Sequence, residues 1–171
     1  MIPYIKVVNN QYVLQLPSTA SFSSNVVKAV QSQLLLTNTT IKKNHSMIDP
    51  TTKEIVSNTD APFFSLARRR CWGHVYWWGI RVYFESNAAV YQEAHYLEIS
   101  GTAVEYIGML SVAVPGIGDV SGALLGAWGK VLSDHNHNVA EALLRYNRRH
   151  KHSYIYMDYN FNGNYSFHTF K

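Results

Sequence analysis

The segment CWGHVYWWGIRVYFES, residues 71–86, alternates aromatic and β-branched side chains with small or polar ones. Successive side chains of a β-strand point to opposite faces of a sheet, so this alternation predicts one strand with two unlike faces. The uniformly apolar set is expected to be buried: Tyr76, Trp78, Ile80, Val82 and Phe84. Trp77, Arg81 and Tyr83 fall on the other, amphipathic face and are expected to contact an envelope or membrane.

This assignment makes the two neighbouring tryptophans unequal. If Trp78 is a core residue, Trp78→Ala lowers the free energy of unfolding by about 3–5 kcal/mol, as large-to-small core substitutions do. Trp77→Ala, on the accessible face, leaves stability nearly unchanged.

The N-terminal third predicts a strand and a helix. Residues 11–16 alternate polar and apolar side chains, as a half-buried strand does. Ser23 or Ser24 then precedes apolar residues at helical spacing, and either serine can cap the helix. We expect residues 1–46 to form a strand-helix appendage and residues 47–66, which are polar and contain breakers, to form a linker.

Residues 67–171 are expected to form the main domain. From Asn87 the apolar period becomes helical, and a basic amphipathic helix follows residues 134–138. The tail has two alternating segments around Asn162-Gly163, a strong hairpin signal. The chain is therefore predicted to be α+β, with an N-terminal strand and helix, an aromatic strand, a central apolar helical hairpin and a C-terminal β-hairpin.

The apolar hairpin is predicted at residues 106–129, where Asp119 is the one charged residue. Breakers in the middle of this segment leave two arms of about 18 Å each, too short to cross a ~30 Å hydrocarbon core. In aqueous solution the hairpin is expected to be buried inside the protein, and it is expected to be competent to insert into a bilayer. The residues assigned to it are Ile107, Leu110, Val114, Pro115, Gly116, Gly118, Asp119, Leu124, Leu125 and Trp128.

The charge and the cysteine content limit which partners and which disulfides the protein can have. Only 15% of the residues are charged, against about a quarter in an average protein, and the net charge is +4. The mild basic excess favours anionic surfaces, and the cations expected to contact an envelope are Arg145, Arg148, Arg149 and Lys151. The single cysteine, Cys71, excludes an internal disulfide and is expected to be either a small buried residue or a thiol that pairs between chains.

Side chains that suggest chemistry are few. His135 and His137 form a weak candidate metal site, because zinc needs three or four convergent ligands. Carboxylates at Glu93, Glu98 and Glu105 are expected on the surface. No nucleophile elbow, phosphate-binding loop or dinucleotide motif occurs in the sequence. We therefore expect no cofactor, no enzymatic activity and no nucleic-acid partner.

The order of segments resembles small secreted bacteriocin-like proteins of Gram-positive bacteria, a group that includes streptococcin A-M57. The resemblance lies in YWWGIRVYFES (residues 76–86), VAVPGIGDVSGALLGAWGKVLS (residues 112–133), the final aromatic strand pair and the N-terminal NNQYVLQLPSTASFS. Residues 134–152 depart from that pattern. The resemblance implies secretion, an antimicrobial or toxin-like role and no enzymatic activity. The start of the chain has no signal-peptide pattern, so secretion implies that the leader is absent.

Two functions follow as hypotheses. The first is a secreted bacteriocin-like protein that engages or permeabilises the membrane of the target cell, with the bacterial membrane or envelope and an immunity protein as partners and oligomers possible on the membrane. The second is a non-enzymatic secreted module that binds cell-wall carbohydrate or another envelope component, with Trp77 and Tyr83 stacking on sugar rings.

Overall fold

The computed structural model describes residues 2–56, 71–100, 135–160 and 162–171. These residues form helices and two antiparallel sheets, which confirms the α+β class. The helical elements are η1 (Ile2–Tyr4), α1 (Ser24–Lys43), α2 (Asn87–Ile99) and α5 (Asn136–Arg149). The predicted insertion hairpin, residues 106–129, lies outside the described residues.

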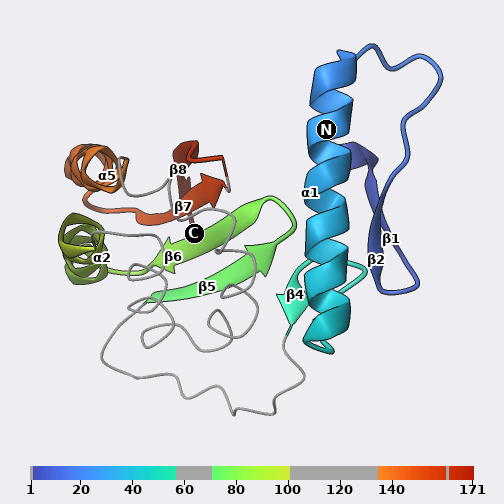
Figure 1. Ribbon diagram of the computed structural model, residues 1–171. Coiled ribbons are helices and arrows are strands. Elements are labelled where there is room, and N and C mark those ends of the chain that lie inside the picture. Colours follow the sequence, from blue (N-terminus) through green and yellow to red (C-terminus); the bar gives the residue numbers. More distant parts are fainter. Residues whose placement is uncertain (1, 57–70, 101–134, 161) are drawn as a thin grey trace.

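The larger sheet has six strands in the order of the chain, and every neighbouring pair is antiparallel (Figure 1). Its strands are β3 (Met47–Ile48), β4 (Ile55–Val56), β5 (Cys71–Tyr76), β6 (Gly79–Phe84), β7 (Tyr154–Asn160) and β8 (Tyr165–Phe170). The predicted C-terminal hairpin is confirmed as β7 and β8. Gly163 in the connection has a φ of 84°, a conformation that glycine adopts without steric cost.

The N-terminal sheet is a hairpin of β1 (Ile5–Val8) and β2 (Gln11–Leu14). Asn9 and Asn10 connect the strands, and both have positive φ, as the central residues of a type I′ turn require. The strand predicted at residues 11–16 is confirmed as β2, whereas β1 was not predicted. The predicted cap is also confirmed, because the Ser23 hydroxyl accepts a hydrogen bond from the backbone N–H of Val26 at the start of α1.

The linker predicted at residues 47–66 is wrong for its first ten residues. β3 and β4 occupy that part of the chain and add to the edge of the six-stranded sheet through the pairing of Ile55 with Val75. The N-terminal hairpin is hydrogen-bonded to the same region. The Asn10 side chain bonds the backbone of Ser46 and Ile48, and the Tyr12 hydroxyl donates to the Lys53 carbonyl at 2.7 Å. Residues 57–66 lie outside the described residues.

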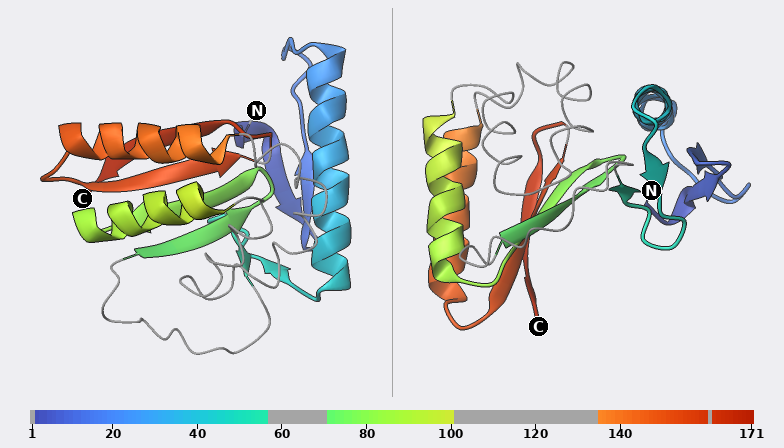
Figure 2. Two further views of the ribbon diagram at one scale, coloured as in Figure 1. Left: turned by 60° about the vertical axis from the view of Figure 1, so that its left-hand side comes forward. Right: turned by 90° about the horizontal axis from the view of Figure 1, so that it is seen from below.

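Helices α2 and α5 lie side by side and cover one face of the six-stranded sheet, whereas α1 lies beyond the end of that sheet (Figure 2). The core between helices and sheet uses the alternate residues of β6 that the sequence predicted, Ile80, Val82 and Phe84. The residues that meet them from the helices and β7 are Val90, Ala94, Leu97, Val139, Ala140, Leu143, Ile155 and Met157. The opposite face of β6 carries Arg81 and Tyr83, as predicted.

Gly79 opens β6 at a point where only a residue without a side chain fits. A Cβ atom there would collide with the Tyr159 carbonyl oxygen of β7 and lie 2.9 Å from the Asn160 Cα. We expect Gly79→Ala to lower the free energy of unfolding by about 1–3 kcal/mol, because overpacking forces the backbone of β7 to shift. Urea denaturation measures the loss, and an unchanged midpoint would contradict this close approach of β6 and β7.

Candidate functional site

A two-residue turn, Trp77-Trp78, joins β5 to β6, and Tyr76 pairs with Gly79 on either side of it. The sequence predicted one continuous strand through this point, so its assignment of the two tryptophans is wrong. The Trp77 side chain is 7% exposed and belongs to the core, whereas Trp78 is only partly buried. Strand alternation does not apply to Trp77 and Trp78 because neither residue is in a strand.

The turn projects toward α1 (Figure 1). Two hollows lie beside it. The larger hollow has a volume of about 460 Å³ and is bordered by the two indoles, by one face of α1 and by the end of β7. The smaller hollow has a volume of about 190 Å³ and is bordered by the same indoles, by the β3–β4 turn and by Arg81. The two hollows therefore share the Trp77-Trp78 turn and also Ile2 as parts of their lining.

The polar groups of the larger hollow are neutral amides. Gln33 comes from α1, Asn160 ends β7, and Asn162 follows in the β7–β8 connection. Asn162 Oδ1 accepts from the backbone N–H of Asn164, which fixes the side chain in the turn. Within the described residues the Asn160 side-chain amide forms no hydrogen bond, so it retains both donor and acceptor capacity.

Arg81 is held on the sheet face beside the smaller hollow. Its Nε and Nη2 donate to the two carboxylate oxygens of Asp158 at 2.6 and 2.7 Å, a bidentate geometry that fixes the plane of the guanidinium. The guanidinium carbon lies 4.4 Å from the centre of the Tyr156 ring. These hydrogen bonds to Asp158 raise the pKa of Arg81 above its ordinary value, so the side chain is a permanent cation.

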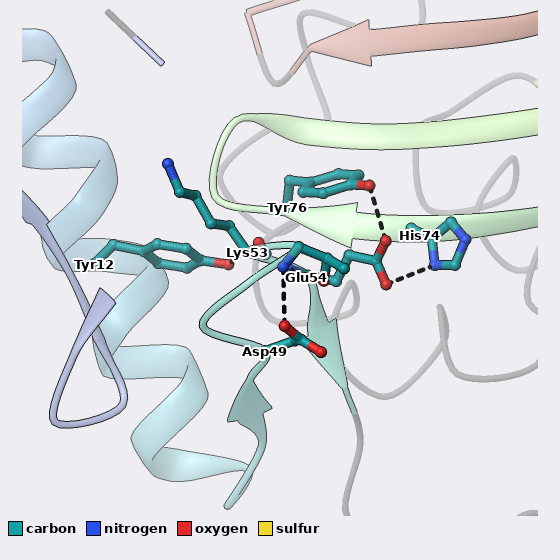
Figure 3. Close-up of polar contacts among 7 residues, drawn as sticks. Tyr12, Asp49, Lys53, Glu54, His74 and Tyr76 are labelled. Atoms are coloured by element: carbon teal, nitrogen blue, oxygen red, sulfur yellow. Dashed lines mark hydrogen bonds and ion pairs between the residues drawn. The ribbon is translucent and has the colours of Figure 1, made fainter. Parts of the chain in front are cut away.

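Glu54, the residue before β4, forms a second polar cluster with His74 and Tyr76 of β5 (Figure 3). One carboxylate oxygen accepts from the Tyr76 hydroxyl at 3.1 Å, and the other lies 3.1 Å from Nδ1 of His74. Burial, and then the Glu54 charge, raise the pKa of Tyr76, so this phenol is a donor at neutral pH. Tyr76 also stacks on Trp78, with ring centres 5.0 Å apart, which links this polar group to the turn.

The sheet face carries a row of rings across four strands. Trp72, Tyr83, Tyr156 and His168 are cross-strand partners in register, and each stacks or tilts against the next at 4.9–5.4 Å. Tyr83, predicted as a contact residue, is therefore packed among aromatic neighbours. Such pairs stabilise a sheet beyond the area they bury.

The predicted basic contact residues do not lie at the Trp77-Trp78 turn. Arg145, Arg148, Arg149 and Lys151 are exposed at the C-terminal end of α5 and in the turn after it. The turn after α5 leads into the first residue of β7. Asn160, which lies beside the Trp77-Trp78 turn, is the last residue of the same strand. Six residue steps of a strand separate the two ends by about 20 Å. The predicted contact surface is thus two surfaces at opposite ends of β7.

The apolar residues assigned to an insertion hairpin all lie outside the described residues, so their arrangement stays a prediction. Among the helices of the described ranges, none is both long and apolar enough to cross a bilayer. Helix α2 begins at Asn87 as predicted, with the Ser86 hydroxyl as its N-cap, and it ends at Ile99, where Ser100 is the C-cap in an extended conformation.

His135 and His137 do not form part of a metal site within the described residues. His135 is exposed at the start of α5, and Nε2 of His137 lies 3.5 Å from the Glu141 carboxylate on the same helix. No group of three or more histidine, cysteine or acidic side chains gathers anywhere in the part of the chain that the structure describes. Of the carboxylates expected on the surface, Glu98 is exposed and Glu93 is buried in α2.

Cys71 is half-buried on β5. Burial, with a smaller effect of the Glu93 charge, raises the pKa of its thiol. Since the thiolate is the reactive form, we expect a thiol-disulfide reagent at pH 8 to label native Cys71 much more slowly than the urea-unfolded chain. Equal labelling rates, or a disulfide-linked dimer on a non-reducing gel, would instead support the alternative of a thiol that pairs between chains.

No protein-family model, no curated protein and no solved structure matches this chain.

Proposed function

We propose that the protein is a non-enzymatic, secreted envelope-binding protein that takes a cell-wall saccharide into the larger hollow beside Trp77-Trp78. The observation that supports this proposal is the combination of two indoles with three neutral amides around one hollow. A sugar ring has apolar C–H faces, which pack on aromatic rings, and hydroxyl groups at its edge, which exchange hydrogen bonds with side-chain amides.

The size of the larger hollow fits this ligand class. About 460 Å³ is within the range of small-molecule sites, roughly 300–1,000 Å³, and such sites pair an apolar lining with a few placed polar groups. The arrangement also favours binding over hydrolysis. Glycosidases place two carboxylates on either side of the scissile bond, and none of the described residues that border the larger hollow is acidic.

A bacteriocin-like action on the membrane is the second candidate. The exposed cations at the end of α5, Arg145, Arg148, Arg149 and Lys151, favour it, since cations on a protein surface attract anionic lipid headgroups. A target membrane, an immunity protein and membrane-bound oligomers belong to this candidate. The two candidates are compatible, because an envelope-binding site can bring the protein to the cell that it acts on.

Calorimetric titration with soluble, lysozyme-digested peptidoglycan from a Gram-positive bacterium tests the proposal. We expect saturable binding that Trp78→Ala weakens by about tenfold or more, equivalent to about 1.4 kcal/mol. Trp72→Ala is the matched control, because it removes another half-buried indole from the sheet face and should leave the affinity unchanged.

Absence of saturable binding, or equal losses in the two variants, would overturn the proposed site. Dye release from anionic vesicles tests the second candidate separately. If the protein releases the dye and Arg148→Gln with Arg149→Gln abolishes that release, the basic end of α5 engages the membrane whether or not the saccharide binds.

A further inference from the structure

The smaller hollow, which shares the Trp77-Trp78 turn with the larger one, differs from it in charge. The larger hollow is bordered by neutral amides, whereas Lys53 and Arg81 border the smaller one and are the charged residues among its described lining. The two hollows share Ile2 and both indoles, so they adjoin at the turn, and an extended ligand that packs on the turn can place groups in both. The neutral amides and the cations thus border adjoining hollows.

Arg81 retains donors for a ligand although it is already paired. Asp158 accepts one N–H from Nε and one from Nη2, the Tyr83 side chain also hydrogen-bonds the guanidinium, and a guanidinium has five N–H groups in total. The bidentate pair neutralises much of the Arg81 charge, and it also holds the guanidinium in one orientation. Arg81 therefore supplies positioned hydrogen-bond donors, and the uncompensated positive charge at the smaller hollow must come from Lys53.

Lys53 occupies a backbone position that its residue type disfavours. Its φ is 62°, in the left-handed region, where glycine and asparagine are the usual choices. The turn is nonetheless tightly bonded. The Lys53 N–H donates to the Asp49 carbonyl at 2.8 Å, Asp49 Oδ1 accepts from the backbone of Thr51 and Thr52, and the Lys53 carbonyl accepts from Tyr12. Backbone strain of this kind is concentrated at functional sites, which directs attention to the Lys53 side chain.

The Lys53 ammonium is available for a ligand. No carboxylate of the described residues forms an ion pair with it. The neighbouring carboxylate, Glu54, points away from the Lys53 side chain, toward Tyr76 and His74, which hydrogen-bond and ion-pair with it (Figure 3). The acidic groups around this hollow are engaged elsewhere: Glu54 with Tyr76 and His74, Asp158 with Arg81, and Asp49 with the backbone N–H groups of Thr51 and Thr52.

We propose that the smaller hollow is an anion subsite formed by Lys53 and Arg81, and that the ligand is an acidic saccharide whose neutral ring lies in the larger hollow. This inference rests on the proposed saccharide-binding function. The acidic group is a carboxylate or a phosphate carried on the sugar, since both accept hydrogen bonds from an ammonium and from a guanidinium.

Three probes separate these possibilities by calorimetric titration at low salt. The neutral probe is an oligomer of N-acetylglucosamine. The carboxylate probe is the same type of sugar backbone with lactyl carboxylates on alternate rings. The phosphate probe is a glucosylated polyglycerol phosphate. We expect one or both acidic probes to bind at least tenfold more tightly than the neutral oligomer, with an affinity that falls as salt rises. The tighter of the two acidic probes identifies the group.

Lys53→Gln tests the subsite, because glutamine keeps most of the length of the side chain and is no better suited than lysine to a positive φ. We expect it to weaken binding of the acidic probe by about tenfold and to leave binding of the neutral oligomer unaffected, since glutamine cannot form a charge-assisted hydrogen bond to the acidic group. Lys151→Gln is the matched control, as it removes an exposed cation at the other end of β7. Circular dichroism establishes that both variants are folded.

The outcomes distinguish the two proposals. Equal affinity for neutral and acidic probes, or an unchanged acidic affinity in Lys53→Gln, overturns the anion subsite and leaves saccharide binding in place if Trp78→Ala still weakens it. Acidic binding that depends on Lys53 but not on Trp78 overturns the saccharide site and keeps the anion subsite. Failure of all three probes to bind overturns both.

Discussion

Phe84→Ala is expected to lower the free energy of unfolding by about 3–5 kcal/mol, the usual cost of truncating a buried aromatic side chain. Phe84 is 1% exposed and lies in β6, in the core between the sheet and the helices. Removing its ring leaves a cavity that the surrounding side chains fill only in part. Urea denaturation monitored by circular dichroism measures the change.

Tyr91→Ala is the matched control for this substitution. Tyr91 is an aromatic residue of α2 that is 55% exposed, and alanine is a good helix former. We expect a change within about 0.5 kcal/mol, as for surface substitutions in general. A loss in Phe84→Ala no larger than that in Tyr91→Ala would show that the helices do not cover this face of the sheet.

Burial in β6 could be predicted from the sequence because a single physical rule determines it. Side chains alternate across a strand, and one set of alternate residues in residues 80–84 is uniformly apolar. The C-terminal hairpin and the cap of α1 were predicted for the same kind of reason, since Asn-Gly and serine have strong local preferences. In each case the signal and the structure lie within a few residues of each other.

The turn between β5 and β6 had no comparable signal. Two-residue hairpin turns are recognised by asparagine, aspartate or glycine, and here both turn residues are tryptophan, a residue typical of strands. Gly79 was the one indication, and its reason is a close approach to β7, about 80 residues away in the chain. β3 and β4 were missed because each has two residues, too few for a period to show.

The hollows could not be predicted from the sequence because their walls come from distant segments. Ile2, Gln33, Trp77 and Asn160 meet only after α1 and β7 have been placed against the turn. Asn136 shows the same limit for a buried polar residue. The sequence predicts that the last helix follows residues 134–138, yet Asn136 begins α5, accepts a hydrogen bond from the Tyr159 hydroxyl and donates one to Ser100. Asparagine favours loops by local propensity, but here Tyr159 of β7 and Ser100 after α2 satisfy the hydrogen bonds of its buried side-chain amide.

Trp77→Ala is expected to reverse the stability order that strand alternation predicts for the two tryptophans. Trp77 is buried among core residues, so its loss should cost about 3–5 kcal/mol. Trp78 is partly buried and packs on Tyr76, so Trp78→Ala should cost only about 1 kcal/mol, less than the 1.5–3 kcal/mol of a fully buried apolar side chain.

The same pair of variants separates the structural role of the turn from its role in binding. If the turn is arranged as described, Trp78→Ala stays folded and loses saccharide affinity. Trp77→Ala loses stability. At temperatures where it is still folded it also loses affinity, because the Trp77 indole borders both hollows. Parallel urea denaturation and titration of the two variants provide the measurement. A greater loss of stability in Trp78→Ala than in Trp77→Ala would restore the continuous strand of the sequence prediction and remove the turn on which both hollows depend.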